Sequence, residues 1–330
     1  MFKYPPENSA TNVQLDTHLA HRGASLHVLA ISNHEQLKKQ IPFAGVFIDR
    51  QVASLRRAGV RISTFYIGGS HSPVRIFREW LKLRTKVRQL NPHLVHGQYG
   101  TIVGLLAAFS GRPAVVSFCG SDLLPGASVS MPRMWFGFLL SNLSALRARV
   151  LICKSRELHQ ALWWRRKYAV VIPNGVDLNL FSPGLQEEAR KELGWDVSRP
   201  IVLFNAGRDP QNKGLDLAKA SIEVTQYRIP DVELHIISAV KPNLMPLYYR
   251  AADVLLCASK QEGSPNVIKE ALACNLPVVS VPVGDVPERL AGVYPSAVAA
   301  RSTCNRGYAG THSLSESAKQ RSGACSSSRP

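Results

Sequence analysis

A short loop between two apolar segments constrains the fold of this chain most strongly. Residues 254–257 read Val-Leu-Leu-Cys and residues 276–281 read Leu-Pro-Val-Val-Ser-Val, and both predict buried strands. Between them, the loop Gly-Ser-Pro-Asn at 263–266 opens a helical segment that carries Glu270, and Glu262 stands directly before the loop. Such a loop presents free backbone N–H groups at the helix start to an anion. The two carboxylates can then bind hydroxyl groups on either side of a phosphate.

Predicted strands and helices alternate along most of the chain. In the first half, strands are predicted at residues 25–31, 60–67, 94–96, 114–118 and 150–153, and helices at 48–58, 73–90, 101–109, 131–148 and 156–164. In the second half, strands are predicted at 170–172, 201–206, 232–238, 254–257 and 277–281, with helices between them. This alternation predicts parallel sheets covered by helices on both faces. We therefore expect an α/β protein with two doubly wound, Rossmann-like domains facing a cleft, where ligands bind at the carboxyl ends of the strands.

The domain boundaries follow from changes in composition. Residues 1–24 are polar and predict a disordered segment, and the first domain is predicted over 25–172. The turn-rich sequence Pro-Asn-Gly-Val-Asp at 173–177 marks the start of the second domain, which is predicted over 173–295. Residues 296–330 are rich in Ser, Arg, Ala and Gly and contain few large apolar side chains, so they predict a disordered tail.

The positive charge of the chain lies in its first half. The net charge is +17, and residues 1–180 carry 23 Lys and Arg against 8 Asp and Glu, whereas residues 181–330 carry 17 against 15. This imbalance predicts an anionic partner for the first half, such as a membrane surface, a phosphorylated acceptor or nucleic acid. We do not expect nucleic acid, because no recognition motif is present and the basic residues are not interleaved with aromatic residues on which bases could stack.

The cysteines and the apolar segments indicate a cytoplasmic protein. The six cysteines form no C-x-x-C pair, which argues against a zinc site or a disulfide framework and favours reduced thiols. The longest apolar stretch, residues 102–109, is too short to span a bilayer. Residues 1–24 lack the apolar core of a signal peptide.

Several motifs in combination resemble those of the family 4 retaining glycosyltransferases. The stretch from Glu262 to Glu270 resembles their donor-site signature, in which two glutamates are separated by seven residues. Residues 173–177 are similar to their hinge motif. Gly207-Arg208 followed by Lys213-Gly214 resembles their phosphate-binding loop, and Gly120-Ser121-Asp122 is similar to a landmark of their first domain.

The resemblance, which covers residues 25–292, implies the two-Rossmann-domain B-type fold and a defined reaction. Members transfer a sugar from a nucleotide diphosphate donor, here UDP- or GDP-linked, to an acceptor with retention of anomeric configuration. They need no metal, and the absence of an Asp-x-Asp triplet here is consistent with that expectation. No cofactor beyond the donor substrate is implied. The implied catalytic residues are Arg208, Lys213 and Glu262, and the implied donor-binding residues are Gly263, Ser264, Pro265, Asn266, Val267 and Glu270.

The resemblance also implies a role for each charged residue of this set. Arg208 and Lys213 match the pair that stabilises the negative charge developing on the leaving diphosphate. Glu262 matches the glutamate that contacts the donor sugar, and Glu270 matches the glutamate that holds the ribose hydroxyls.

The first domain contributes candidates for the acceptor site or the cleft. These are Gly45, His96, Cys119, Gly120, Asp122 and, at the hinge, Asn174. Cys119 stands where many relatives have a histidine near the donor sugar, so histidine-assisted chemistry is not expected there. Gly45 is the single glycine of a loop that is usually Gly-Gly in the family. A structural role for His96 is as consistent with the sequence as an acceptor contact.

The carboxyl-terminal tail departs from the family pattern. Relatives continue past the position of Val293 with another pair of helices, the last of which crosses back onto the first domain. Here the composition changes abruptly, as expected for a shifted reading frame or a truncated gene. We therefore expect an incomplete second domain and impaired activity. The alternatives to an active transferase are a catalytically inactive nucleotide-sugar-binding remnant and a nucleotide-sugar epimerase of the same fold.

The predicted helix at 73–90 carries a basic stripe made of Arg75, Arg78, Lys82 and Lys86. The stripe is as typical of a solvated crossover helix as of a helix lying on an anionic membrane surface. The sequence Trp-Trp-Arg-Arg-Lys at 163–167 favours the membrane slightly, because aromatic and basic groups suit a headgroup layer. We expect a glycan or lipid-linked acceptor, and peripheral association with the inner face of the plasma membrane.

Overall fold

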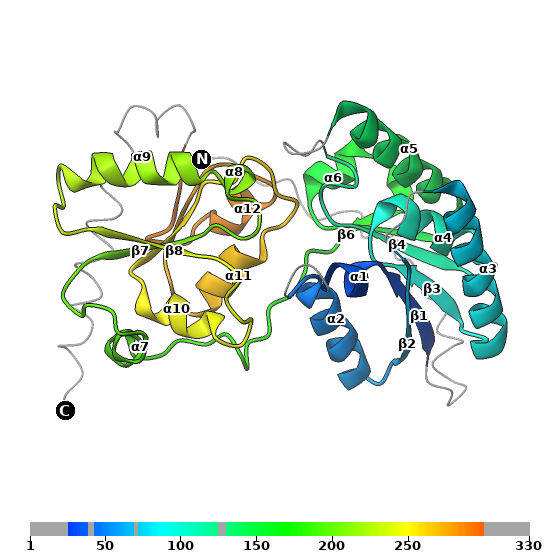
Figure 1. Cartoon of the computed structure of the whole chain (residues 1–330), viewed down its shortest axis with the longest axis horizontal. Coiled ribbons are helices and arrows are strands. Elements are labelled where there is room, and N and C mark those ends of the chain that lie inside the picture. Colours follow the sequence, from blue (N-terminus) through cyan, green and yellow to red (C-terminus); the bar gives the residue numbers. More distant parts are fainter. Residues whose placement is uncertain (1–25, 39–42, 69–71, 125–129, 300–330) are drawn as a thin grey trace.

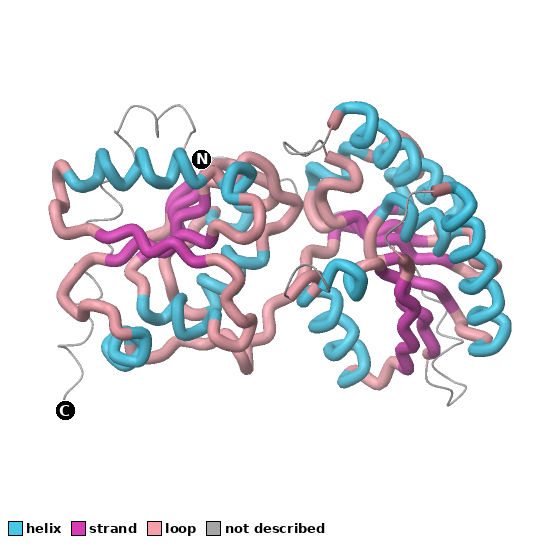
Figure 2. Tube along the Cα trace, viewed as in Figure 1, coloured by secondary structure: helices cyan, strands magenta, loops and turns pink. Residues whose placement is uncertain are grey.

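The computed structural model describes residues 26–38, 43–68, 72–124 and 130–299, which form two parallel sheets with helices packed on them (Figure 1; Figure 2). The predicted α/β class with two Rossmann-like domains is confirmed. The sheets lie side by side, with α2 and α6 of the first domain nearest to the second domain in Figure 1. The predicted disordered segment at 1–24, and residues 300–330 of the tail predicted to be disordered over 296–330, lie outside the described residues. The predicted domain boundaries remain predictions.

The first sheet has six parallel strands in the order β2-β1-β3-β4-β5-β6. The strands are β1 (His27–Ser32), β2 (Arg61–Tyr66), β3 (Leu94–Gly97), β4 (Ala114–Phe118), β5 (Val150–Cys153) and β6 (Ala169–Val171). The helices are α1 (His34–Lys38), α2 (Val46–Arg57), α3 (Pro73–Leu90), α4 (Leu105–Ala108), α5 (Met131–Arg147) and α6 (Arg156–Ala161), with short helical segments η2 (Gly100–Gly104) and η3 (Arg166–Tyr168).

The side-chain alternation of β1 explains why both faces of this sheet carry helices. All six residues of β1 are buried. Val28 and Ala30 pack in one apolar cluster with residues of α2, while Leu29 and Ile31 pack in another with residues of α3 and α4. Successive side chains of a strand point to opposite faces, so a wholly apolar strand requires cover on both sides. In Figure 1, α2 accordingly lies across the sheet from α3 and α4.

The second sheet has five parallel strands in the order β11-β10-β9-β7-β8. The strands are β7 (Ile201–Asn205), β8 (Glu233–Ile237), β9 (Val254–Cys257), β10 (Val278–Ser280) and β11 (Ala297–Val298). The helices are α7 (Gln186–Leu193), α8 (Pro210–Lys213), α9 (Leu215–Gln226), α10 (Met245–Ala251), α11 (Asn266–Ala273) and α12 (Val286–Leu290). None of the helices in the described part of the chain combines the length and apolar character that crossing a bilayer requires.

Three expectations from the sequence need correction. The strand predicted at 170–172 as part of the second half is β6, which pairs with β5 and completes the first sheet. Residues 297–298, predicted to be disordered, pair with β10 as the edge strand β11. The helix predicted at 101–109 is divided into η2 and α4, and Thr101 within η2 has non-helical backbone angles (φ −42°, ψ −122°). Gly100 lets η2 approach α5 closely, since a Cβ there would lie 2.6 Å from Ser141 Oγ.

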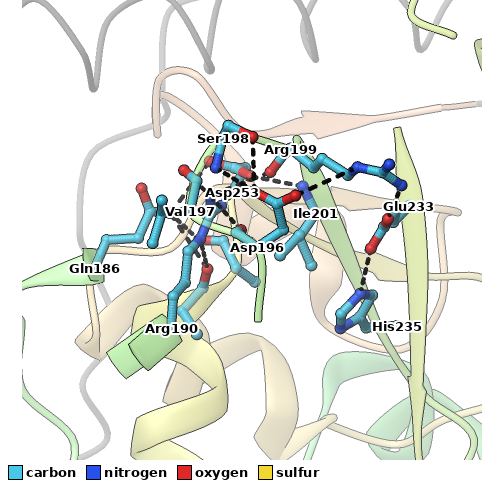
Figure 3. Close-up of polar contacts among 12 residues, drawn as sticks. Gln186, Arg190, Asp196, Val197, Ser198, Arg199, Ile201, Glu233, His235 and Asp253 are labelled. Carbon is cyan, nitrogen blue, oxygen red and sulfur yellow. Dashed lines mark hydrogen bonds and ion pairs between the residues drawn. The ribbon is translucent and has the colours of Figure 1, made fainter. Parts of the chain in front are cut away.

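A buried ion pair anchors α7 to the second sheet (Figure 3). Arg190 is 3% exposed and donates to Asp253 Oδ2 at 2.6 Å, and the same carboxylate oxygen accepts the backbone N–H of Ile201 at 2.7 Å. Arg190 also donates to the backbone carbonyls of Val197 and Ala251, each at 2.8 Å. The pair therefore ties α7 to the starts of β7 and β9, on the side of the sheet opposite the carboxyl ends that carry the candidate site.

Candidate functional site

The loops after β7 and β9 lie against each other at the carboxyl edge of the second sheet. Gly214 has φ +75°, and a Cβ there would lie 2.2 Å from the carbonyl oxygen of Ala258. Asp209 caps α8 by accepting the backbone N–H of Asn212 at 3.0 Å. These contacts hold Lys213, the last residue of α8, next to the loop that carries Glu262.

Lys213 and Glu262, predicted to be catalytic, form an ion pair. Lys213 Nζ lies 2.5 Å from Glu262 Oε1, which also accepts the Ser259 hydroxyl at 3.1 Å. Burial alone would lower the pKa of Lys213, but the charge and hydrogen bond of Glu262 outweigh it and raise the pKa. Lys213 therefore stays protonated at neutral pH.

Arg208, the third predicted catalytic residue, remains available to a ligand. Its guanidinium makes no hydrogen bond or ion pair with any residue that the structure describes. Partial burial lowers its pKa, although a guanidinium stays charged at any physiological pH. Gly207, with φ +56°, turns the chain before Arg208 and packs against the Lys213 side chain. Two cations, Arg208 without a partner among the described residues and Lys213 paired with Glu262, thus lie near the loop that carries Glu262.

Glu270, predicted to hold the ribose hydroxyls, connects the two domains. It is 8% exposed, and both carboxylate oxygens accept hydrogen bonds: Arg50 Nη1 donates to Oε1 at 2.7 Å, and the Tyr249 hydroxyl donates to Oε2 at 3.0 Å. Arg50 comes from α2 and also lies over the ring of Phe181, 5.0 Å from its centroid. Ribose hydroxyls would have to share Glu270 with Arg50 or displace it. The sequence offered no signal for the role of Arg50, because its partner lies 220 positions away.

The Ser264 side chain of the Gly-Ser-Pro-Asn loop already makes hydrogen bonds within the second domain. The Ser264 hydroxyl donates to Asp285 Oδ2 at 2.7 Å, and Lys269 Nζ donates to Ser264 Oγ at 2.9 Å and to the carbonyl of Asn174 at 3.0 Å. Burial lowers the pKa of Lys269 to about 8. Pro265 directly precedes α11 with extended backbone angles. Asn266 and Val267 begin the helix.

The first domain touches this loop through Cys119 and Gly120. A Cβ on Gly263 would lie 2.4 Å from the carbonyl oxygen of Cys119 and 3.2 Å from Gly120 Cα. Burial, reinforced by the charge of Asp122, raises the pKa of the Cys119 thiol well above its usual range. The thiol therefore stays protonated and is a poor nucleophile. Only glycine at 263 allows this approach between the domains.

Asp122 and His96, predicted to lie in the acceptor site or the cleft, are instead buried and make hydrogen bonds within the first domain. Asp122 is 1% exposed and accepts the backbone N–H groups of Gly100, Cys119 and Gly120 at 2.8, 3.1 and 2.8 Å. His96 is buried and bonded to the Ser117 hydroxyl at 2.8 Å. These contacts give both side chains a structural role.

Gly45 and a small polar cluster lie together near the end of β1. Gly45 has φ +71° and packs against His34, which bonds Ser32 Oγ at 2.6 Å and Asp49 Oδ1 at 3.0 Å. In the described residues, His34, Glu35 and Asp49 form a grouping of the kind that could hold a metal ion. The Lys38 ammonium lies 2.7 Å from Glu35 and 2.8 Å from Asp49, so its positive charge already compensates the charge of these two carboxylates. The expectation that no metal is needed remains a prediction.

The burial of His96 predicts a dependence of stability on pH. Burial, and then the nearby positive charge of Lys154, lowers the pKa of His96 from 6.5 to about 4. Between these values the unfolded chain binds a proton that the folded chain does not, so the free energy of unfolding should fall as pH drops through this window. The loss is roughly 1.4 kcal/mol per pH unit, about 3 kcal/mol in full. Urea denaturation at pH 7 and at pH 4.5 measures this loss. Between these pH values, the free energy of unfolding should fall less in His96→Asn than in the wild type. His159→Asn controls for the loss of a histidine, and equal losses in all three proteins would contradict this role of burial.

The two glutamates should respond differently to neutralisation. Glu270→Gln should weaken nucleoside diphosphate binding about tenfold, because an amide accepts hydroxyl protons through one oxygen only. Glu262→Gln should reduce sugar transfer more than nucleoside diphosphate binding, because its expected partner is the sugar. Titration calorimetry and transfer rates measured on both variants test this division, with Glu223→Gln on the exposed face of α9 as the control. Identical behaviour of the two variants toward the diphosphate would show that the roles are wrongly divided.

Comparison with known proteins identifies the family. Residues 11–180 match the family described as Glycosyltransferase Family 4, more than half of the chain. The chain belongs to Glycosyltransferase Family 4. Residues 198–302 of this family 4 chain also match the family described as Glycosyl transferases group 1. The resemblance noted from the donor-site motifs is therefore confirmed.

Two curated relatives of the family 4 chain are named as glycosyltransferases. A D-inositol 3-phosphate glycosyltransferase of Segniliparus rotundus is 32% identical over 150 residues, 37% of this chain and 33% of the relative. A putative teichuronic acid biosynthesis glycosyltransferase, TuaC of Bacillus subtilis, is 28% identical over 220 residues, 61% of this chain and 56% of the relative. The chain thus spans between a third and a little over half of these relatives.

Solved structures share the fold over most of the chain. Sucrose-phosphate synthase from Thermosynechococcus elongatus superimposes with a TM-score of 0.68 at 17% identity, covering 89% of this chain and 90% of the other. HepE of Anabaena, in complex with UDP and glucose, gives a TM-score of 0.62 at 17% identity and covers 91% and 99%. At this identity the likeness concerns the fold alone.

Proposed function

We propose that this chain is a retaining glycosyltransferase that moves a sugar from a UDP- or GDP-linked donor to a glycan or lipid-linked acceptor without a metal ion. One observation carries the proposal. The Arg208 guanidinium, which has no partner in the described part of the chain, and the Lys213–Glu262 ion pair lie on the same side of the second sheet, near the start of α11. Family membership and the UDP named in the HepE structure support the choice of donor. The name of the TuaC relative supports a glycan acceptor.

The proposed chemistry follows from how charge moves in the reaction. Breaking the bond between the sugar and the diphosphate leaves negative charge on the outer phosphate. Arg208 offers planar, bidentate donors and Lys213 a compact charge, and preorganised cations of this kind stabilise such a leaving group. Glu262 holds Lys213 in position before the donor arrives. As the diphosphate accepts Lys213, Glu262 becomes free to accept a hydroxyl of the donor sugar.

Turnover of a panel of UDP- and GDP-sugars, followed by proton NMR in the presence of chelator, tests the proposal. We expect slow release of sugar even without acceptor, and the first anomer formed should have the configuration of the donor. Release of the opposite anomer would rule out retention. Diphosphate binding without turnover of any donor would instead support the inactive remnant.

We further propose that the protein acts in the cytoplasm at the inner face of the plasma membrane, through α3. The helix exposes Arg75, Arg78 and Lys82 to solvent, and Phe77 and Leu81 are 57% and 46% exposed beside them. Exposed apolar and basic groups on one helix suit an anionic lipid surface.

Reversing the basic stripe of α3 should abolish binding to anionic vesicles. Each basic residue near such a surface contributes about 1 kcal/mol, so replacing Arg75, Arg78, Lys82 and Lys86 with Glu removes about 4 kcal/mol and adds repulsion. Sedimentation with vesicles of anionic or neutral lipid measures the effect, and the control reverses Lys191 and Lys219 of the second domain. Undiminished sedimentation of the α3 variant would exclude α3 as the membrane contact.

A further inference from the structure

A cavity of about 290 Å³ opens between the two domains. Its walls come from α2, from the hinge segment 172–178, from the end of β5 and from the start of α11. The polar lining includes Arg50, Gln51, Arg57, Lys154, Asp177 and Asn266. The volume is at the low end of small-molecule sites, which measure about 300–1,000 Å³, and suits a single sugar unit.

The cavity contains a buried cation that lacks a counter-ion. Lys154 directly follows β5 and is 2% exposed, yet its ammonium makes no ion pair or hydrogen bond with any residue in the described ranges. The other two cations of the wall are paired, Arg50 with Glu270 at 2.7 Å and Arg57 with Asp177 at 3.5 Å. Burial accordingly lowers the pKa of Lys154. An unpaired buried charge is costly, so an anion bound here would be strongly favoured.

Two residues of the cavity wall also carry a buried side-chain oxygen that accepts no hydrogen bond in the described part of the chain. Gln51 Oε1 and Asn266 Oδ1 are buried and have no hydrogen-bond partner. Buried polar atoms are rarely left unsatisfied, so each requires an explanation. Gln51 belongs to α2 of the first domain and Asn266 to α11 of the second. A ligand with hydroxyl groups could donate to both and so join the domains across the cavity.

We propose that this cavity binds a sugar unit bearing a carboxylate or phosphate, with its anionic group on Lys154 and its hydroxyls on Gln51 and Asn266. Because the donor phosphates have their own cations, Arg208 and Lys213, we assign this unit to the acceptor. The side chain of Asn266, expected from the resemblance to bind the donor, would then bind the acceptor instead. That assignment rests on the proposed transferase function.

Titration calorimetry of the full chain with glucuronate, glucose 1-phosphate, glucose and inorganic phosphate tests the proposal. Both anionic sugars should bind more tightly than neutral glucose or inorganic phosphate alone. Lys154→Met should weaken them about tenfold or more, because a charge-assisted contact is lost. Methionine nearly matches the length of lysine and is easily buried, so the variant should fold, which its melting temperature checks. Lys167→Met, at an exposed position of the same domain, is the matched control. Gln51→Leu should weaken the binding of the sugars although the Lys154 ammonium is retained.

The outcomes separate this inference from the proposed function. Equal affinity for glucose and glucuronate, or anionic sugars unaffected by Lys154→Met, would overturn the subsite. The subsite would also be overturned if Lys154→Met lost nucleoside diphosphate binding rather than the binding of anionic sugars, because the cavity would then be part of the donor site. Lys154-dependent binding of anionic sugars in a chain that binds no nucleoside diphosphate would uphold the site and overturn the transferase proposal.

Discussion

Replacing Lys213 with methionine should weaken nucleoside diphosphate binding by about 10- to 100-fold and reduce sugar transfer by more. One contact between an ammonium and a phosphate contributes about 1.5–3 kcal/mol. The variant also leaves Glu262, now without its 2.5 Å partner, to repel the diphosphate. Calorimetry and donor turnover measure the two effects.

Two comparisons make the Lys213 result specific. Lys219→Met, on the exposed face of α9, should leave both quantities unchanged. Arg208→Ala should weaken diphosphate binding too, but by less than Lys213→Met, because it leaves no carboxylate unpaired. Wild-type affinity in both Lys213→Met and Arg208→Ala would remove the phosphate-binding role from this loop.

Replacing Gly263 with alanine should separate donor binding from catalysis. The added Cβ would lie 2.4 Å from the carbonyl oxygen of Cys119, and neither backbone segment can yield as a flexible side chain would. Overpacking of this kind costs about 1–3 kcal/mol, which opposes the approach of the domains and should lower turnover by about 10- to 100-fold. Diphosphate binding to the second domain should persist.

Small-angle X-ray scattering can follow the separation of the domains directly. The radius of gyration of Gly263→Ala should exceed that of the wild type. Gly68→Ala is the matched control, because an added Cβ there has nothing within 4 Å. A Gly263→Ala protein with wild-type dimensions and wild-type turnover would show that the Cys119 contact has no part in the reaction.

Local patterns predicted most of the fold. The apolar runs at β4, β5 and β9 and the periodicity of α3 gave the bounds that the structure shows, because burial along one short segment determines these elements. The strand β11 was missed because its two residues depend on pairing with β10 rather than on their own pattern.

The sequence suggested the residue types of the candidate site but not their contacts. Arg208, Lys213, Glu262 and Glu270 were proposed from the resemblance of second-domain motifs to the family, and their roles remain predictions. The ion pair between Arg50 and Glu270 was not predicted, because it joins residues of different domains. The sequence likewise did not predict that the buried Lys154 ammonium has no ion-pair partner among the described residues. The absence of a partner depends on how the whole chain folds around Lys154.

The most direct test of the central claim is titration of the full chain with UDP and with GDP in the presence of chelator. The account predicts that one of the two diphosphates binds at a single site without metal, and that Lys213→Met weakens that binding. Absence of binding by both diphosphates, or binding that appears only when a divalent cation is added, would contradict it.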